Sequence, residues 1–201
     1  MSGKIIYGVG VYKKGKFKSW ENGKITKEYN SWRSMMERCY DPAAHEIRPT
    51  YIGCSVCPDW LCFQAFAEWY HANYPQDGES YQLDKNLKVI GNKVYSPDTC
   101  LFTSDGVSNF ISDNGSIRGR HMIGVYWDGS RDKYMASCCN PFTKKQEKLG
   151  RFACELEAHL AWRKRKSELA YELAMTQTNP EVRDALLRWK DALDNNEIHT
   201  V

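Results

Sequence analysis

The stretch "YQLDKNLKVIGNKVYSPDTC", residues 81–100, decides how the first half of the chain folds. Its first residues alternate between apolar and polar side chains up to Asp84, a pattern typical of a half-buried strand. A loop follows that contains two asparagines, Asn86 and Asn92. These residue types allow two interpretations. Either Asp84 and Asn92 make the turn hydrogen bonds of a plain hairpin, or Asp84 is half of a metal site.

The residues that follow, "LFTSDGVSNF" at 101–110, predict a second strand and a short helix. Ser104 or Asp105 is a suitable N-cap for this helix, and Asn109 falls on it. The order strand, loop, strand, helix therefore places polar residues at the end of the first strand and on the helix. In the hairpin interpretation, Asn109 is only a surface amide.

The chain has 201 residues, of which 42% are hydrophobic, and a formal net charge of +3. This length and composition predict one or two globular domains. The first residues contain no apolar run long enough for a signal peptide, and nothing resembles a membrane span, so we expect a cytoplasmic protein without a membrane partner. In that compartment the eight cysteines are expected to be reduced, buried or metal-bound rather than disulfide-linked.

Basic residues are concentrated in the second half of the chain. Between Ser116 and Lys166 there are twelve basic and five acidic side chains, a net charge of +7 on about a quarter of the sequence. Such a segment can neutralise nucleic-acid phosphates and release their counterions. The alternative is a solvated lysine face.

Two amphipathic helices are expected before residue 81. The first has an apolar stripe at helical spacing, which consists of Trp32, Met35, Met36 and Cys39. The pair Asp41-Pro42 predicts the end of this helix. The stretch "DWLCFQAFAEWYHANY", residues 59–74, predicts the second helix, and residues 4–29 predict a two-stranded ribbon.

The stretch "DNGSIRGR", residues 113–120, is small, polar and basic, as expected of a linker. Beyond it, three strand-like segments joined by turns precede a long helix, and a last helix is expected from about Pro180 to Ala192. The fold class predicted is therefore α+β. One module covers residues 1–112, and a second module with a three-stranded sheet and helices covers residues 121–201.

Residues 29–112 resemble a phage-type group of HNH (ββα-metal, His-Me finger) endonucleases and their homing-endonuclease relatives. The matching segments are, in order, "SWRSMMERCY", "PTYIGCSVCPDWLCFQAFAEW", "LDKN", "GNKVYSPDTCLFTS" and "VSNF". The similarity depends on the order and spacing of these segments, because any one segment alone is weak evidence. The resemblance implies a ββα-metal module with flanking helices, which uses Mg²⁺ or Mn²⁺ to cleave phosphodiester bonds of double-stranded DNA.

By this resemblance, Asp84 is the acidic ligand of the divalent ion and Asn109 is the ligand on the helix. Asn92, or Asn86, corresponds to the loop residue that braces the base or the strand ends. The family pattern has a histidine base directly after the acid, whereas this chain has Lys85 there. Lysine is a poor base unless burial favours its neutral form. Lys85 could instead neutralise the transition-state phosphate, or the site could be inactive.

Four cysteines suggest a separate structural metal site. Cys54 and Cys57 form one pair, and Cys39 and Cys100 lie on flanking elements that could meet it. Four thiolates would make a closed zinc site of the kind that braces some HNH nucleases. The alternative is ordinary buried thiols, since cysteine packs as a small hydrophobic residue.

The segment from Ile123 to about Ala170 resembles the ethylene-response-factor (Apetala-type) DNA-binding domain, through "GVYWD", "KYMAS" and "KLGRFACELEAHLAW". In phage proteins such domains often follow HNH nuclease domains. The resemblance implies a three-stranded sheet that lies in a DNA groove. The candidate DNA-contacting residues are Trp127, Arg131, Lys133, Tyr134, Lys144 and Lys145, with Arg118 and Arg120 of the linker. For Trp127 and Tyr134 the alternative is packing within the sheet.

Together these features predict a metal-dependent DNA endonuclease of the nicking or homing type, from a bacteriophage or mobile element, acting in an infected or host bacterial cell. Lys85 favours an alternative, a catalytically inactive DNA-binding regulator on a nuclease-derived scaffold. A third class, a protein that binds and blocks a host-defence protein, leaves no signature in the residues. The residues do not indicate an oligomeric state.

Overall fold

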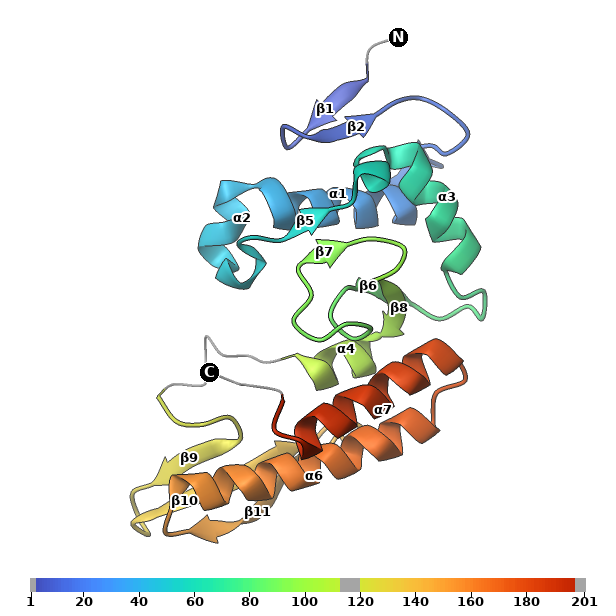
Figure 1. Ribbon diagram of the computed structural model, residues 1–201. Coiled ribbons are helices and arrows are strands. Elements are labelled where there is room, and N and C mark those ends of the chain that lie inside the picture. The colour runs from blue at the N-terminus through green and yellow to red at the C-terminus, as the bar shows by residue number, and fades with distance from the viewer. Residues whose placement is uncertain (1–2, 113–119, 198–201) are drawn as a thin grey trace. The chain divides into compact units, whose positions relative to one another are not determined.

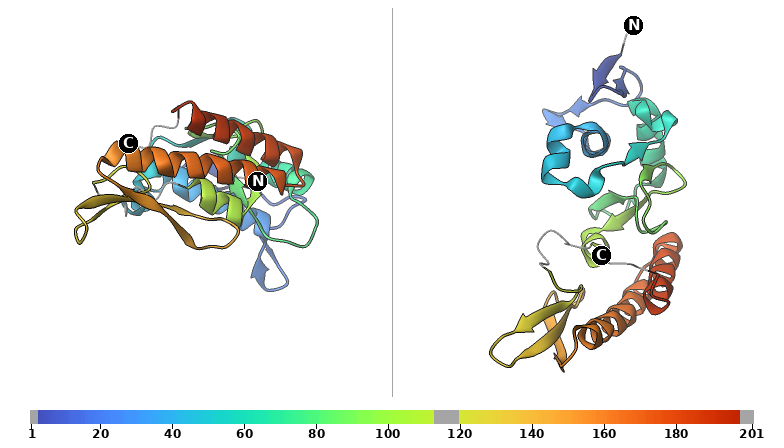
Figure 2. Two further views of the ribbon diagram at one scale, coloured as in Figure 1. Left: turned by 90° about the horizontal axis from the view of Figure 1, so that it is seen from below. Right: turned by 60° about the vertical axis from the view of Figure 1, so that its left-hand side comes forward.

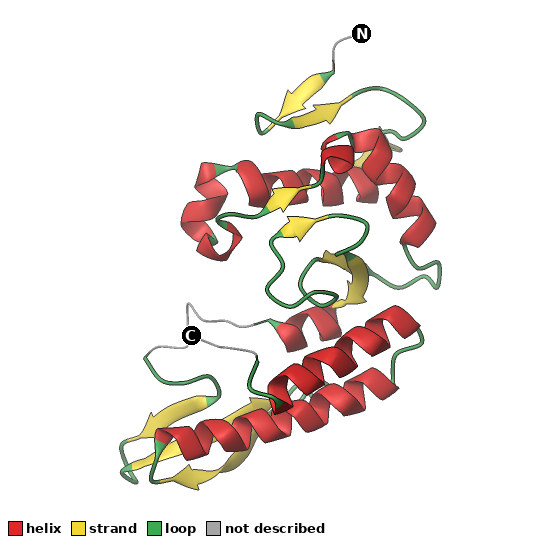
Figure 3. Cartoon of the chain, viewed as in Figure 1, coloured by secondary structure: helices red, strands yellow, loops and turns green. Residues whose placement is uncertain are grey.

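The computed structural model describes residues 3–112 and 120–197, and it combines helices with small sheets (Figure 1; Figure 3), so the fold class is α+β. The chain divides into two compact units, Met1–Ser104 and Asp105–Val201. This division falls before residue 112, so the helix α4 (Asp105–Ile111) belongs to the second unit. Most of the expected linker, residues 113–119, lies outside the described residues.

The first unit begins with two separate hairpins instead of the single ribbon predicted over residues 4–29. Strand β1 (Lys4–Ile6) pairs with β2 (Gly10–Tyr12), and β3 (Trp20–Glu21) pairs with β4 (Lys24–Ile25). The second hairpin turns at Asn22-Gly23, where both residues have positive φ, as a tight hairpin turn requires.

Helix α1 (Lys27–Tyr40) buries the predicted apolar stripe of Trp32, Met35, Met36 and Cys39. It ends at Asp41, whose side chain accepts a hydrogen bond from the Ala43 backbone N–H at 3.1 Å and so caps a further helix, α2 (Pro42–Ile47). The chain then continues through a 3₁₀ turn (Pro49–Tyr51), strand β5 (Ser55–Val56) and a second 3₁₀ turn (Pro58–Leu61). Helix α3 (Phe63–Asn73) follows, as predicted.

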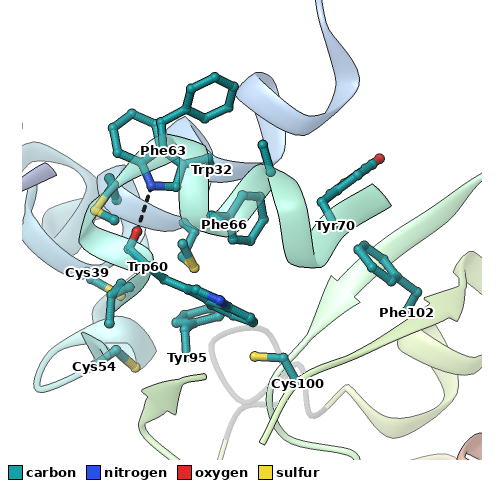
Figure 4. Close-up of a cluster of buried hydrophobic side chains, with 14 residues drawn as sticks. Trp32, Cys39, Cys54, Trp60, Phe63, Phe66, Tyr70, Tyr95, Cys100 and Phe102 are labelled. Atoms are coloured by element: carbon teal, nitrogen blue, oxygen red, sulfur yellow. Dashed lines mark hydrogen bonds between the residues drawn. The ribbon is translucent and has the colours of Figure 1, made fainter. Parts of the chain in front are cut away.

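The core of the first unit is rich in aromatic residues (Figure 4). Trp32 of α1 and Phe63 of α3 are fully buried, with ring centroids 5.6 Å apart. The indole N–H of Trp32 donates a 2.8 Å hydrogen bond to the backbone oxygen of Trp60, so the buried polar atom is satisfied. This core packs α1 and α3 together and contacts the strands that carry the candidate site.

Three strands follow α3 in the first unit: β6 (Tyr81–Asp84), β7 (Val94–Tyr95) and β8 (Leu101–Ser104). Strand β6 pairs with β8 in antiparallel register, with Asp84 opposite Leu101, while β7 pairs with β5 in parallel. Asp84 therefore lies at the last position of a paired strand, directly before the loop to β7.

The second unit contains the predicted sheet, with strand order β11-β10-β9 and all neighbours antiparallel. Its strands are β9 (Val125–Asp128), β10 (Lys133–Cys139) and β11 (Gln146–Phe152), followed by helices α6 (Glu155–Met175) and α7 (Pro180–Asp194). Helix α6 covers one face of the sheet, and α7 packs against α6 (Figure 2). Within residues 3–112 and 120–197, none of the helices combines the length and apolar composition needed to cross a bilayer.

Gly124 directly precedes β9, and a substitution at this position tests the contact between β9 and α6. Its φ is +77°, and a Cβ at this position would lie 2.0 Å from Cγ of Trp162. We expect Gly124→Ala to lower the free energy of unfolding by about 3 kcal/mol, since overpacking and a left-handed backbone both cost energy. In Gly129→Ala, the matched control, the new Cβ would meet only Trp127, at an ordinary 3.7 Å. Equal urea midpoints for the two variants would contradict this packing.

Candidate functional site

Asp84 is fixed by the loop that it begins. Its Oδ1 accepts hydrogen bonds from the backbone N–H groups of Asn86 at 2.8 Å and Leu87 at 2.7 Å. Leu87 is buried and anchors the loop. Among the described residues no donor bonds to the other oxygen, Oδ2. The turn hydrogen bonds of the hairpin interpretation are thus present, and they orient the carboxylate with one oxygen left as a hard ligand.

Lys85 points into the first unit and is only 5% exposed. Its Nζ donates to Oδ1 of Asn86 at 2.6 Å and to the backbone oxygen of Asn92 at 2.9 Å. It also lies 5.8 Å from the ring centroids of Tyr51 and Tyr95. An ammonium group held in this way is not presented to a DNA phosphate. The structure therefore favours a bracing role for Lys85 over the phosphate-neutralising role considered from the sequence.

Asn92 closes the same loop from the opposite side. Its Nδ2 donates to the backbone oxygens of Lys85 at 2.8 Å and Val94 at 2.7 Å, and its Oδ1 accepts from the Val94 N–H at 3.1 Å. Asn86 participates through its bond from Lys85. Both asparagines named from the sequence therefore hold the loop between β6 and β7, with Asn92 tying its two ends together.

Asn109 lies in α4, in the second unit, and is exposed. The helix is held by Phe110, whose ring centroid is 5.7 Å from that of Trp189. Lys166 adds a cation–π contact at 3.7 Å from the Phe110 ring and a 2.5 Å hydrogen bond to its backbone oxygen. Because Asp84 and Asn109 belong to different units, a cation shared by the two remains a prediction.

Three of the four cysteines proposed for zinc, Cys39, Cys54 and Cys100, are buried in the aromatic core, and Cys57 is partly buried beside it (Figure 4). Burial raises the pKa of the thiols of Cys39 and Cys100 to about 12. In the part of the chain that the structure describes, no three or more Cys, His, Asp or Glu side chains form a group able to hold a metal ion. The burial and packing of these thiols fit the alternative interpretation, ordinary buried thiols, and the zinc site stays a prediction.

Thiol labelling tests this interpretation. In the native protein we expect iodoacetamide to modify Cys139 and Cys154, which are exposed, and to leave Cys39, Cys54 and Cys100 intact until the protein unfolds. Peptide mass spectrometry measures the order of modification. Bound zinc in elemental analysis, together with reactivity at Cys54 only after addition of a chelator, would contradict it.

The sheet of the second unit has one face against α6. Val125 and Ala136 pack on Ala158 of this helix, and Tyr134 joins them from the same side of β10. Trp127 pairs with Tyr134 across the strands, and their ring centroids are 4.8 Å apart. Residues paired across an antiparallel sheet point to the same face. Trp127 and Tyr134 therefore lie on the same face as Val125 and Ala136. Tyr134 packs there, as in the packing alternative, whereas Trp127 is 41% exposed and its contact with DNA stays a prediction.

The opposite face of the sheet, which we call the open face, carries Tyr126, Asp128, Lys133, Met135, Lys148 and Arg151. Met135 is buried at its centre, opposite Tyr126 on one side and Arg151 on the other. Lys133, Lys148 and Arg151 are exposed. Of these cations, only Lys133 is among the DNA-contacting candidates named from the sequence.

A β-bulge explains why Lys148 and Arg151 share the open face. They are three residues apart, so regular alternation would place them on opposite faces. The register shifts between Ala136 and Ser137, and Gly150 in the bulge has a φ of +139°. Arg151 then pairs with Met135 and Lys148 with Ser137. Gly150, the glycine in "KLGRF", is the one sequence feature that could have indicated this bulge.

The acidic side chains of the sheet are engaged by partners. Asp128 accepts a 3.0 Å bond from Nε of Arg151, and hydrogen bonds from Ser130 and Arg151 lower the pKa of Asp128. On the helix-covered face, Glu147 bonds to Arg165 at 2.7 Å. Hydrogen bonds from Arg165 and from an asparagine lower the pKa of Glu147 to about 2. Asp128 offsets one of the three cations of the open face, Lys133, Lys148 and Arg151, so this face keeps a net positive charge near neutral pH.

Three of the remaining DNA-contacting candidates lie in the turns of the sheet. Arg131 is exposed in the turn between β9 and β10, and Lys144 and Lys145 are exposed in the turn between β10 and β11. Arg120 is exposed, whereas Arg118 lies outside the described residues. These turn residues flank the open face.

Comparisons of the chain with protein-family models, with curated proteins and with solved structures found no match. The function proposed below therefore depends on the arrangement of the residues themselves and on the resemblances noted in the sequence.

Proposed function

We propose that the chain binds double-stranded DNA through the open face of the β9–β11 sheet. The observation that carries this proposal is the bulged register that gathers Lys133, Lys148 and Arg151 beside Tyr126 on the side away from α6. A two-stranded β-ribbon fits the major groove of DNA, and some DNA-binding proteins place the strands of a sheet in a groove. The two lysines would neutralise phosphates, and the arginine, held by Asp128, can donate to a phosphate or a guanine edge.

Fluorescence anisotropy with a labelled duplex, in a salt titration without divalent ions, tests this binding. We expect the logarithm of the binding constant to fall linearly with the logarithm of the salt concentration, with a slope of about −0.9 per phosphate contacted. The expected value is about −2.7 or steeper, for the three cations of the open face. No binding at low salt would contradict the proposal and would favour the host-protein-blocking class.

We further propose, on the resemblance to HNH endonucleases, that Asp84 holds a divalent ion for phosphodiester cleavage, with Asn109 as the ligand from the helix. The Asp84 carboxylate fits such an ion, because Oδ1 is occupied by two backbone amides and Oδ2 accepts no bond among the described residues. When bound, Mg²⁺ or Mn²⁺ stabilises negative charge on the scissile phosphate and the leaving oxygen. The chain's own contribution is the loop held by Lys85 and Asn92, which orients Asp84.

One observation favours a second candidate, a DNA-binding regulator without cleavage. The position of the family's histidine base is taken by Lys85, whose amine is buried and hydrogen-bonded within its own loop. A plasmid-nicking assay with Mg²⁺ or Mn²⁺ separates the two functions. Cleavage supports the endonuclease, whereas tight binding without cleavage supports the regulator.

A further inference from the structure

A polar cleft of about 250 Å³ runs along α1 and β6 in the first unit. From α1, it is lined at helical spacing by Lys27, Ser31, Ser34 and Arg38. From the other side it is lined by Ser80 and Gln82. None of its lining residues in the described part of the chain is acidic. The cleft therefore offers two cations, hydroxyl groups and amides to a ligand, which is the chemistry that binds a phosphodiester.

The two cations of the cleft contact aromatic rings rather than carboxylates. No carboxylate of the described residues lies within ion-pair distance of Lys27 or Arg38. Lys27 Nζ is 5.8 Å from the Tyr74 ring centroid, and Arg38 Cζ is 5.6 Å from that of Tyr51. Burial works to lower the pKa of Arg38, but the nearby phenols of Tyr95 and Tyr51 outweigh it, so the pKa is raised.

The acidic residues of α1 are bound elsewhere. Glu28 Oε1 lies 3.5 Å from Nε2 of His71, and Glu37 Oε2 accepts a 3.2 Å hydrogen bond from the hydroxyl of Tyr7. Neither glutamate lines the cleft. The sequence shows an amphipathic helix with a polar side, but it does not separate the acidic from the basic positions on that side.

We propose that this cleft binds the phosphodiester backbone of duplex DNA and guides the bound strand toward Asp84. The inference deepens the proposed function and rests on it. Strand β6 lines the cleft up to Leu83 and ends at Asp84. At about 3.3 Å per residue, Gln82 and Asp84 are about 7 Å apart along the strand, equal to about two nucleotides of duplex DNA. A phosphate held in the cleft beside Gln82 would thus place a phosphate about two nucleotides further along the strand beside the carboxylate.

Lys27 and Lys24 form a matched pair for the test. Both are exposed lysines of the first unit, three residues apart, but only Lys27 lines the cleft. In the full chain we expect Lys27→Gln to reduce the salt slope of duplex binding by about 0.9, and to weaken binding about 5-fold at 0.15 M salt. We expect Lys24→Gln to leave both unchanged. Arg38→Gln, checked for folding by thermal unfolding, is expected to act like Lys27→Gln.

The outcomes separate this inference from the proposed function. If the wild-type chain binds duplex DNA and Lys27→Gln behaves like Lys24→Gln, the cleft proposal fails and DNA binding by the open face stands. If the wild-type chain binds no duplex at low salt, the proposed function fails, and the cleft proposal with it. A lower slope for Lys27→Gln and restoration by Lys27→Arg support the cleft.

Discussion

Replacing Lys133, Lys148 and Arg151 together by glutamine is expected to weaken duplex DNA binding on the order of 100-fold at 0.15 M salt. The salt slope should become less negative by about 2.7, because three phosphate contacts are lost. All three side chains are exposed on the open face, so the substitutions leave the contacts between the sheet and α6 unchanged. Anisotropy titrations at four salt concentrations measure both quantities.

The control is a variant with the same loss of charge on the helices of the same unit. Lys164 of α6 and Arg183 and Arg188 of α7 serve this purpose, because they lie outside the sheet. The triple glutamine variant at these positions is expected to bind within about 3-fold of wild type, since none of the three side chains belongs to the open face and salt screens surface charges at longer range. Equal losses in both triple variants would show that net charge, and not the open face, determines binding.

Local periodicity was enough to predict most of the helices and strands. The stripe from Trp32 to Cys39 is buried as expected, and the three strands and two long helices of the second unit occur in the predicted order. No apolar periodicity in the sequence predicts helix α2. The pair Asp41-Pro42 predicts only the end of α1, but Asp41 also caps α2, and Pro42 suits its first turn.

The candidate site was less predictable because it depends on contacts between residues distant in sequence. Lys85 follows an acid in a polar loop, which suggests exposure, but Asn92 and Tyr51 provide it with a buried environment. Likewise, strand alternation alone separates Lys148 from Arg151, and only the bulge opposite Ala136 and Ser137 brings them together. The alternation of polar and apolar side chains along a strand does not predict which contacts close a loop. It also does not predict where a β-bulge changes the register.

Asp84→Asn is expected to reduce metal-dependent plasmid nicking at least 100-fold while leaving duplex binding unchanged. The amide keeps an oxygen that can accept the bonds from Asn86 and Leu87, so the loop is retained, whereas the negative charge that attracts Mg²⁺ or Mn²⁺ is lost. Asp98→Asn is the matched control, because Asp98 is an exposed acid in the turn that follows β7. Equal nicking by wild type and Asp84→Asn would reject the catalytic role of Asp84.

Lys85→Met distinguishes a brace from a catalytic base in the same assay. Loss of the bonds to Asn86 and Asn92 leaves two oxygens without their donor, so we expect the free energy of unfolding to fall by about 2 kcal/mol. If Lys85 only orients Asp84, the nicking rate should decrease by the same factor at every pH, and the shape of the pH profile should not change. A pH profile that loses one limb, with stability unchanged, would instead identify Lys85 as the proton acceptor. The burial of its amine makes the first result the expected one.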